Sequence, residues 1–440
     1  MANVDCEEYM LVDLDEVGVW DLCWILICEH MGARRFIKSN NDKELDGTFF
    51  RRFIIFISIV IIKVIKLFSK TLERLGWLVE SSLNLWTQYG KNEELRRMSP
   101  DFSSVIGLTD TRLDLDDEIT QEDPRYKSAL AIMAAKTAYE NPNRVQKIVH
   151  DHWKMDFVGF YNCSNEYVVK QDTVEKRHPT QAFIFSDKTG DHEVICVSFR
   201  GTSPFSADDW CTDLDLSWYH LRGVGKVHAG FLKALGLQKN KEGHPSWPKE
   251  LKEDNKPNDR IFAYYEIRKV LREQLQRNED ARFIVTGHSL GGALAVLFPA
   301  ILGFHKEVKL LEKLEGVYTF GQPRVGDHKF CEYMKQLLGA RRYFRFVYAN
   351  DIVMVKEPNE NYFSVPLIPF KYLNAGFEIV RSFILPYAYG RDYKEGILLL
   401  GVRSFGMLFI PGVSAHCPQD YVNLTRLASP DTFQHALQDD

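Results

Sequence analysis

The ten residues Ile284-Val-Thr-Gly-His-Ser-Leu-Gly-Gly-Ala293 decide the fold of this chain. The apolar residues before Gly287 predict a buried strand, and the small and apolar residues after Ser289 predict a helix that begins at once. Between them, Gly287-His-Ser-Leu-Gly291 has the spacing that holds a serine hydroxyl on a sharp strand-to-helix turn. Glycines suit this turn because side chains two residues either side of the serine would collide with the neighbouring strand and helix. Ser289 is therefore a candidate nucleophile, and a purely structural glycine turn is the alternative.

A serine nucleophile needs a base, and the base needs an orienting carboxylate. On a fold with this turn, the carboxylate follows the serine in the chain and the histidine comes last. The histidines after Ser289 are His305, His328, His416 and His435. We expect His305 at the end of the helix after the turn, His328 at the start of the next helix and His435 in the polar tail. His416 is left as the expected base, with an ordinary histidine of a surface loop as the alternative.

The expected carboxylate is Asp351. It comes just after the alternating segment Arg342-Tyr-Phe-Arg-Phe-Val-Tyr348, which predicts a strand. In α/β sheets the C-terminal ends of strands carry functional groups. The rival, Asp327, comes directly before a predicted helix and fits the role of its N-cap better.

Ester or amide chemistry at a serine also needs backbone N–H groups that stabilise the negative charge on the carbonyl oxygen. We expect one from Leu290, directly after the nucleophile. The other is expected after the buried strand Glu193-Val-Ile-Cys-Val-Ser-Phe199, where Gly201 permits close approach and Thr202 offers an amide and a hydroxyl. An ordinary hairpin turn at this point is the alternative.

Five motifs follow one another in the order seen in class 3 lipases, the α/β-hydrolases that are similar to the fungal triacylglycerol lipases. They are Phe199-Arg-Gly-Thr202, Trp210-x-x-Asp213-Leu214, Val227-His-Ala-Gly-Phe231, Gly287-His-Ser-Leu-Gly-Gly292 and Phe320-Gly-Gln-Pro323. The resemblance covers about residues 125–430. The segment Pro411-Gly-Val-Ser-Ala-His-Cys-Pro-Gln-Asp-Tyr421 and a long, hydrophobic N-terminal extension, expected to be mainly helical, look most like the plant oil-body triacylglycerol lipases.

The resemblance implies an α/β-hydrolase domain that hydrolyses esters of neutral lipid without a cofactor or metal ion. Carried over by position, it assigns a catalytic triad, an oxyanion hole, an elbow and a lid over 203–213. These residues are Ser289, Asp351 and His416 for the triad, Thr202 and Leu290 for the oxyanion hole, Gly287 and Gly291 for the elbow, and Phe205 and Trp210 for the lid. The same triad would serve a phospholipase or galactolipase, and a non-catalytic lipase-like scaffold is a further alternative.

The chain departs from the family pattern at two places. Many members have Asp immediately before the catalytic histidine, where this chain has Ala415. The usual proline-rich stretch after the catalytic Asp is replaced by Ile352-Val-Met-Val-Lys-Glu-Pro358. Neither change touches a triad atom, so they concern the substrate pocket and the pose of His416.

The N-terminal part of the chain has a different character. Residues 53–62 are free of charge, about half of the roughly 20 residues that a bilayer span needs. Lys63 and Lys66 interrupt the apolar run, and Trp77 and Trp86 follow in an amphipathic stretch. We expect residues 49–90 to lie in the interface of a lipid droplet or membrane. A helix packed on the main domain and a true transmembrane span are the alternatives.

These patterns divide the chain into four parts: an N-terminal segment over 1–48, the anchor over 49–90, a polar linker over 91–124 and the α/β-hydrolase domain over 125–440. With 440 residues and a formal net charge of −5, the composition suits a globular enzyme and gives no sign of nucleic-acid binding. The eight cysteines lack a paired framework, so reduced thiols are expected. Cys417 beside His416 is discounted as a nucleophile because Ser289 occupies the turn. The expected location is a lipid-droplet surface facing the cytosol.

Overall fold

The computed structural model describes most of the chain. The described residues are 6–14, 16–28, 35–39, 49–87, 97–164, 179–237, 239–241, 244–246, 261–339, 341–348, 351, 380, 384, 398–399, 401–404, 414–431 and 433. Most of residues 358–410, a segment rich in aromatic residues, and most of the polar segment 238–259 lie outside this set.

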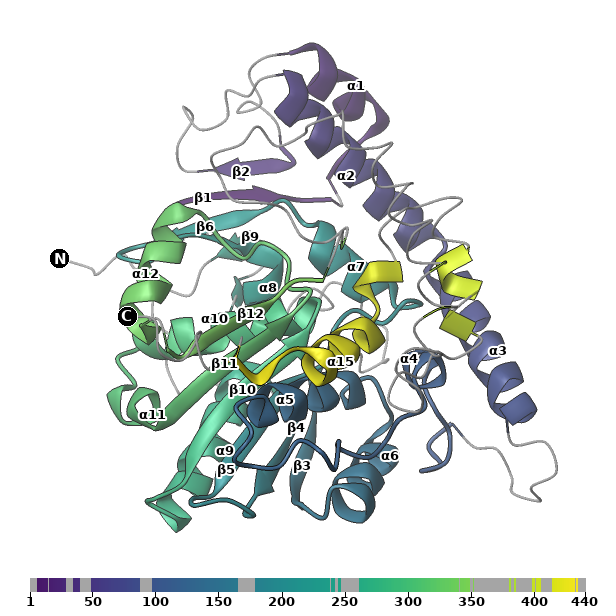
Figure 1. Cartoon of the computed structure of the whole chain (residues 1–440). Coiled ribbons are helices and arrows are strands. Elements are labelled where there is room, and N and C mark those ends of the chain that lie inside the picture. Colours follow the sequence, from purple (N-terminus) through teal and green to yellow (C-terminus); the bar gives the residue numbers. More distant parts are fainter. Residues whose placement is uncertain are drawn as a thin grey trace.

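A six-stranded sheet forms the centre of the molecule (Figure 1). Its order is β12-β11-β10-β5-β4-β3, with β5, β10, β11 and β12 parallel and β3 and β4 antiparallel at one edge. The strands are β3 (Asp156–Cys163), β4 (Thr180–Asp187), β5 (Val194–Phe199), β10 (Arg282–His288), β11 (Leu314–Phe320) and β12 (Tyr343–Phe346). The strands expected at 193–199 and 342–348 are present as β5 and β12, and the strand predicted before Ser289 is β10.

Helices cover both faces of this sheet. Successive residues of β10 point to opposite faces, so Phe283 and Val285 enter one apolar core and Ile284 enters the other. The first core also holds α8 (Ala229–Ala234), α9 (Ala263–Arg277), α10 (Leu290–Phe304), α11 (Val308–Lys313) and α12 (His328–Leu338). The second holds α5 (Tyr126–Thr137), α6 (Pro142–Lys147), the π-helical turn Ile148–His152 and α15 (Pro418–Leu427). Burial on both faces explains why β5 and β10 are continuous apolar runs.

A second, smaller sheet joins the N-terminus to the main domain. Its order is β2-β1-β6-β7, and β1 pairs antiparallel with β6, for example Tyr9 with Tyr219. The strands are β1 (Cys6–Val12), β2 (Ile37–Ser39), β6 (Trp218–Leu221) and β7 (Gly225–His228). Strand β1 was not predicted, because two adjacent acidic residues interrupt the alternation of apolar and polar positions in this segment. The described part of segment 1–48 is therefore paired with the main domain. The short hairpin β8 (Lys239–Lys241) and β9 (His244–Ser246) forms a third sheet.

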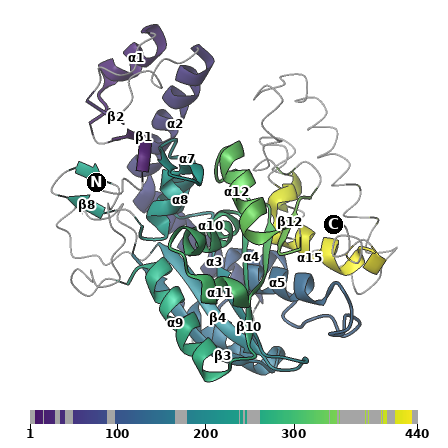
Figure 2. The same ribbon diagram turned by 90° about the vertical axis from the view of Figure 1, so that its left-hand side faces the viewer.

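Three N-terminal helices run along one edge of the molecule: α1 (Val19–Ile27), α2 (Phe49–Leu67) and α3 (Ser69–Thr87). In Figure 1, α2 crosses the upper right as one long diagonal that α3 continues, and Figure 2 shows α1, α2 and β1 together above α7 and α8. Ile55, Ile59 and Ile62 of α2 are buried in a third apolar cluster with β1 and β2. No helix in the described part of the chain is long and apolar enough to cross a membrane.

The described part of the expected linker, 97–124, packs on the main domain instead of standing free. It contains α4 (Val105–Thr109), and its Asp110 and Arg112 are buried side by side. Lys136 of α5 donates to the backbone carbonyl of Asp110, and Arg112 donates to the side chain of Asn423 on α15. Polar composition suggested a linker, but these polar groups are buried as pairs that satisfy one another.

Candidate active site

The serine turn stands between β10 and α10, at the C-terminal end of the central strand. Ser289 has φ 58° and ψ −128°, a left-handed conformation that is strained for a residue with a side chain. A Cβ on Gly287 would lie 2.2 Å from the backbone of Gly291, and a Cβ on Gly291 would lie 2.2 Å from the carbonyl oxygen of Phe199. Both glycines are therefore required by close backbone contacts, as the spacing of the motif predicts.

Ser289, His416 and Asp351 come from three distant parts of the chain and form one hydrogen-bonded chain. The Oγ of Ser289 lies 2.8 Å from Nε2 of His416. The Nδ1 of the same ring lies 2.8 and 2.9 Å from the two carboxylate oxygens of Asp351. Asp351 follows β12 and is buried, and His416 ends the short 3-10 helix Ser414–His416. Of the other histidines considered, His305 caps the C-terminus of α10, His328 opens α12, and His435 lies outside the described residues.

This arrangement fixes the direction of proton flow. Asp351 accepts a hydrogen bond from the N–H at Nδ1 of His416. The unprotonated Nε2 therefore faces the hydroxyl of Ser289 and can take the proton of that hydroxyl. The carboxylate also stabilises the imidazolium that forms. The rival carboxylate Asp327 is the N-cap of α12, where its Oδ1 accepts from the amide of Phe330 at 3.0 Å.

Tyr421, which sequence reasoning did not identify, contacts the carboxylate of the triad. The Oη of Tyr421 donates to Oδ2 of Asp351 at 2.5 Å, and Tyr421 is fully buried on α15. Burial raises the pKa of Tyr421 far above its usual range, so its hydroxyl stays protonated and remains a donor. The sequence feature that could have pointed to this role is the position of Tyr421, five residues after His416 on a helix that begins at Pro418.

His288, inside the serine turn, contacts the backbone of the catalytic base His416 and helps to hold it in position. Its Nε2 lies 2.8 Å from the backbone carbonyl oxygen of His416, and its Nδ1 lies 2.9 Å from the Oη of Tyr139 on the chain after α5. Burial lowers the pKa of His288 well below its usual value, so the ring is neutral. A neutral ring has one donor and one acceptor, which fits donation to the carbonyl and acceptance from the tyrosine.

The predicted oxyanion turn lies directly against the serine turn. A Cβ on Gly201 would lie 2.4 Å from the carbonyl oxygen of His288, so only glycine permits this approach. Thr202 donates its hydroxyl to Oδ2 of Asp213 at 2.5 Å. Burial raises the pKa of Asp213 to about 7, against the opposing effect of the hydrogen bond from Thr202.

The segment expected to be a lid contains α7 (Ala207–Leu214), whose N-cap is Ser206. Trp210 is exposed and donates from its ring to the carbonyl of Pro204 at 3.1 Å. The carboxylate of Asp209 is buried, where it pairs with Arg200 at 2.9 Å. Phe205 points to α3, where a Cβ on Gly76 would lie 2.6 Å from its side chain.

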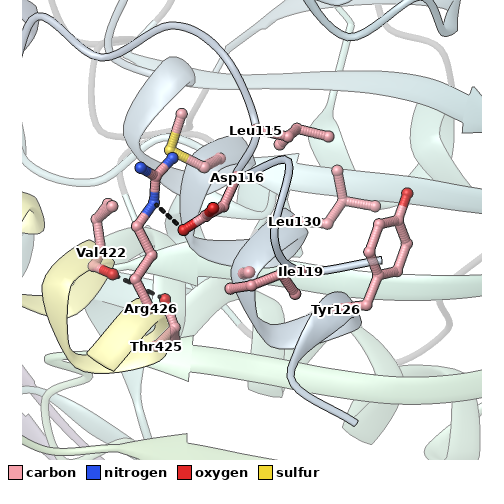
Figure 3. Close-up of a pocket in the computed structure, with 10 residues that line it drawn as sticks. Leu115, Asp116, Ile119, Tyr126, Leu130, Val422, Thr425 and Arg426 are labelled. Carbon is pink, nitrogen blue, oxygen red and sulfur yellow. Dashed lines mark hydrogen bonds and ion pairs between the residues drawn. The ribbon is translucent and has the colours of Figure 1, made fainter. Parts of the chain in front are cut away.

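A small cavity lies between α5 and α15. It has a volume of about 10 Å³ and is enclosed by α5, α15 and the stretch around Leu115 to Ile119, with the ion pair between Asp116 and Arg426 at its edge (Figure 3). This volume is about enough for one water molecule, so the cavity does not hold an acyl chain. No group of acidic, histidine or cysteine side chains among the described residues could hold a metal ion.

Together, the mostly parallel sheet and the serine on the turn after its central strand define an α/β-hydrolase with a Ser-His-Asp site. Comparison with known proteins agrees. The family described as Lipase (class 3) matches residues 196–359. The triacylglycerol lipase OBL1 of Nicotiana tabacum is 37% identical over 87% of this chain and 84% of its own length. The triacylglycerol lipase OBL1 of Ricinus communis is 34% identical over 97% of this chain and 96% of its own.

Among solved structures, lipase II from Rhizopus niveus is 25% identical, with 57% of this chain and 76% of that chain covered and a TM-score of 0.35. On the strength of the sequence relatives, the chain belongs to the class 3 lipase family and is a carboxylic ester hydrolase. The family resemblance that the motifs predict is thereby confirmed.

Proposed function

We propose that this protein hydrolyses triacylglycerol at the surface of lipid droplets, with Ser289 as nucleophile, His416 as general base and acid, and Asp351 as the orienting carboxylate. The observation that carries the proposal is the unbroken chain from Ser289 through His416 to Asp351, with heavy-atom distances of 2.8 Å on both sides of the imidazole. The name triacylglycerol lipase on relatives that match nearly the whole chain supports the choice of substrate.

The reaction has two halves. Nε2 of His416 takes the proton of Ser289 as Oγ attacks the ester carbonyl, and the backbone amides of Thr202 and Leu290 stabilise the oxyanion. The imidazolium then gives its proton to the leaving alkoxide, which departs as diacylglycerol and leaves an acyl-enzyme. Water, deprotonated by His416, attacks the acyl group and releases the fatty acid. Loss of one oxyanion donor is expected to lower kcat by about 10²–10³.

Attachment to a lipid surface is the second part of the proposal. Helices α2 and α3, which make up the described part of 49–90, expose aromatic and aliphatic side chains to the outside, which supports a role as an interfacial anchor. Such an anchor would keep the enzyme on the particle that holds its substrate, on the cytosolic side. Phe205 and Trp210 belong to the segment that we propose as the lid.

The test is fatty-acid release by the full-length protein from emulsified triacylglycerol and, separately, from phospholipid vesicles. We expect release mainly from triacylglycerol, complete loss in Ser289→Ala, and no loss in Ser429→Ala, a matched change of an exposed serine. Release mainly from vesicles would assign the enzyme to phospholipids and contradict the proposed substrate. Release that survives in Ser289→Ala would contradict the nucleophile.

A further inference from the structure

Helix α2 has two apolar faces instead of one. The inner face is buried against β1, β2 and the segment expected to be the lid, and it consists of Ile55, Ile59 and Ile62. The outer face is exposed and consists of Phe53, Ile57, Ile61 and Val64, with the exposed Phe68 directly after the helix. The spacing of three and four residues places each set on one side of the helix. An apolar face of this length in water indicates a second contact.

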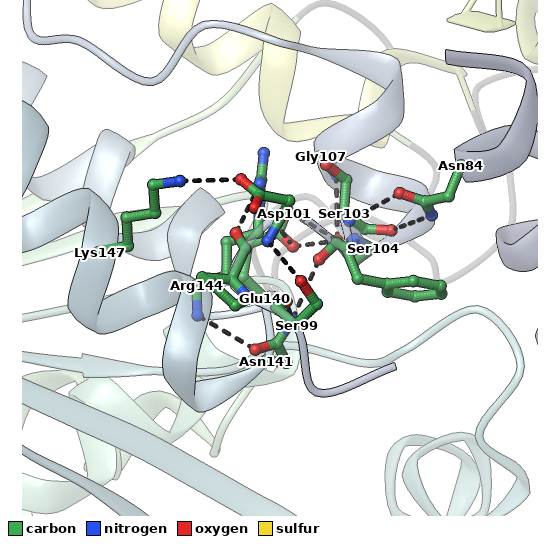
Figure 4. Close-up of polar contacts among 12 residues, drawn as sticks. Asn84, Ser99, Asp101, Ser103, Ser104, Gly107, Glu140, Asn141, Arg144 and Lys147 are labelled. Carbon is green, nitrogen blue, oxygen red and sulfur yellow. Dashed lines mark hydrogen bonds and ion pairs between the residues drawn. The ribbon is translucent and has the colours of Figure 1, made fainter. Parts of the chain in front are cut away.

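Helix α3 repeats the arrangement. Its outer face carries Leu75, Leu78, Leu85 and Trp86, all exposed, and Trp77 is exposed on another side of the helix. Its inner face fastens it to the main domain. There the side chain of Asn84 exchanges two hydrogen bonds with the backbone of Ser103, at 2.8 and 2.9 Å, and Glu80 accepts from the amide of Val105 at 3.2 Å (Figure 4 shows the Asn84 contacts). The helix is therefore held in a fixed position while its apolar side faces outward.

The segment 203–214 sits on the inner side of the same two helices. Phe205 packs on α3 at Gly76, where a Cβ would lie 2.6 Å from the phenylalanine side chain, so only glycine leaves room. At the other end, Cys211 is buried in the cluster with the inner face of α2. The hydroxyl of Ser58 on α2 also donates to the carbonyl of Leu214 at 2.7 Å. Both ends of the segment thus rest on the α2–α3 pair.

We propose that the α2–α3 pair binds a lipid surface with its outer face and seats the lid with its inner face, so that lipid contact and lid position are linked. This inference rests on the proposed function, and it adds the element through which the lipid surface acts on the active site. Trp210 is exposed on the same lid segment, which gives the lid its own apolar contact with the surface.

The chemistry of the outer face favours a lipid surface as its occupant. Tryptophan and phenylalanine are the side chains that settle at boundaries between water and lipid. Lys70 and Arg74 are exposed at the start of α3, beside the single exposed acid Glu73, which suits a surface with anionic headgroups. The face is also continuous with the segment that borders the active site, so the surface that it meets is the one that carries the ester.

The link follows from burial of apolar area. In water, movement of the lid away from the α2–α3 pair would expose Phe205 and Cys211, which opposes the movement. Against a lipid surface that cost falls, because the freed side chains and Trp210 enter an apolar environment. A surface that contacts one lid position better than another shifts the population toward it.

The test measures access to Ser289 directly, independent of the natural ester. The full-length protein is labelled with a water-soluble fluorophosphonate, in buffer alone and with triolein droplets coated with phosphatidylcholine and phosphatidylserine. The quantity compared is the ratio of the labelling rate with droplets to the rate in buffer. We expect this ratio to be well above one for the wild-type protein.

Three variants separate the two faces. Gly76→Ala displaces Phe205, and Phe205→Ala removes the same contact without adding atoms, so each is expected to speed labelling in buffer and to lower the ratio at least about threefold. Ser429→Ala, a change of similar size at an exposed serine outside α2, α3 and the lid segment, is expected to leave the ratio unchanged. Leu78→Gln combined with Leu85→Gln is expected to lower both flotation with the droplets and the acceleration by droplets.

The outcomes are distinct. A wild-type ratio in both Gly76→Ala and Phe205→Ala, or full acceleration in the Leu78→Gln, Leu85→Gln variant, would overturn the inference and leave the proposed function intact. A dimer in buffer that this double variant abolishes would assign the outer face to a second copy of the chain and overturn the lipid assignment. Failure of Ser289 to react under any condition would contradict the proposed function itself, and the inference with it.

Discussion

Three side chains hold the imidazole of His416 in its place between serine and carboxylate. Asp351 binds Nδ1, Tyr421 binds the far side of Asp351, and His288 holds the backbone carbonyl of His416. Ala415 stands where many relatives have Asp, and its side chain is buried in the apolar core instead. The pose of His416 therefore depends on Tyr421 and His288, without a contribution from residue 415.

Tyr421→Phe is expected to lower kcat about 10- to 100-fold with little change in KM, because a hydrogen bond to a charged group contributes about 1.5–3 kcal/mol. The reason is positional, since Tyr421 orients Asp351 and does not reach the substrate. Steady-state kinetics on a soluble ester measures the effect. Tyr333→Phe, which removes a hydroxyl that donates to Ala300 on the far side of α10, is the control. An unchanged kcat in Tyr421→Phe would refute the positioning role.

Asp213 gives the molecule a pH dependence of stability. Because burial raises its pKa to about 7, the folded chain keeps a proton on this carboxyl that the unfolded chain has lost above its usual value of 3.8. The free energy of unfolding therefore falls as pH rises from about 4 to 7 and levels off above that window. Asp213→Asn removes this dependence, so its stability relative to the wild-type protein should increase between pH 5 and 8. Denaturant titrations at the two pH values measure the difference, and Asp280→Asn, an exposed substitution, should show none.

Among the helices and strands, those of the main domain follow from local sequence, as do the long helices α2 and α3, but the N-terminal strands do not. The apolar run before Ser289 and the small-residue segment after it each specify their own structure, and both are present as β10 and α10. Strand β1 could not be predicted, because it exists only through pairing with β6, more than two hundred residues later. The packed state of 97–124 was hidden for the same reason, since its charges are satisfied by α5 and α15.

The attachment of α3 is expected to depend on Asn84. In Asn84→Ala, the amide and carbonyl of Ser103 lose their side-chain partner while buried, which should lower the free energy of unfolding by about 1–3 kcal/mol. Faster hydrogen exchange in α3 and at Ser103 would be the direct sign. Asn143→Ala removes one exposed hydrogen bond to Met98 and is expected to change stability by less than about 0.5 kcal/mol. Equal exchange in the two variants would contradict the role of Asn84.

The described part of the chain forms one α/β-hydrolase domain, and the N-terminal strands and helices pack on that domain. The triad could be assigned from sequence because chain order and strand ends restrict each role to very few residues. The supporting groups Tyr421 and His288, and the contact of Phe205 with Gly76, could not, because each joins segments that sequence spacing does not relate. The helices α2 and α3, which we propose to face lipid, thus contact the expected lid, and the lid segment follows directly after Gly201, which packs against the serine turn.

The most direct test of this account is the site and rate of covalent labelling by a fluorophosphonate, read by mass spectrometry on the full-length protein. We expect one adduct, on Ser289, absent in Ser289→Ala and slowed by about 10³-fold or more in His416→Ala, because the serine is then without its base. An adduct on another residue, or an unchanged rate in His416→Ala, would contradict the assignment of Ser289 and His416 as the catalytic pair.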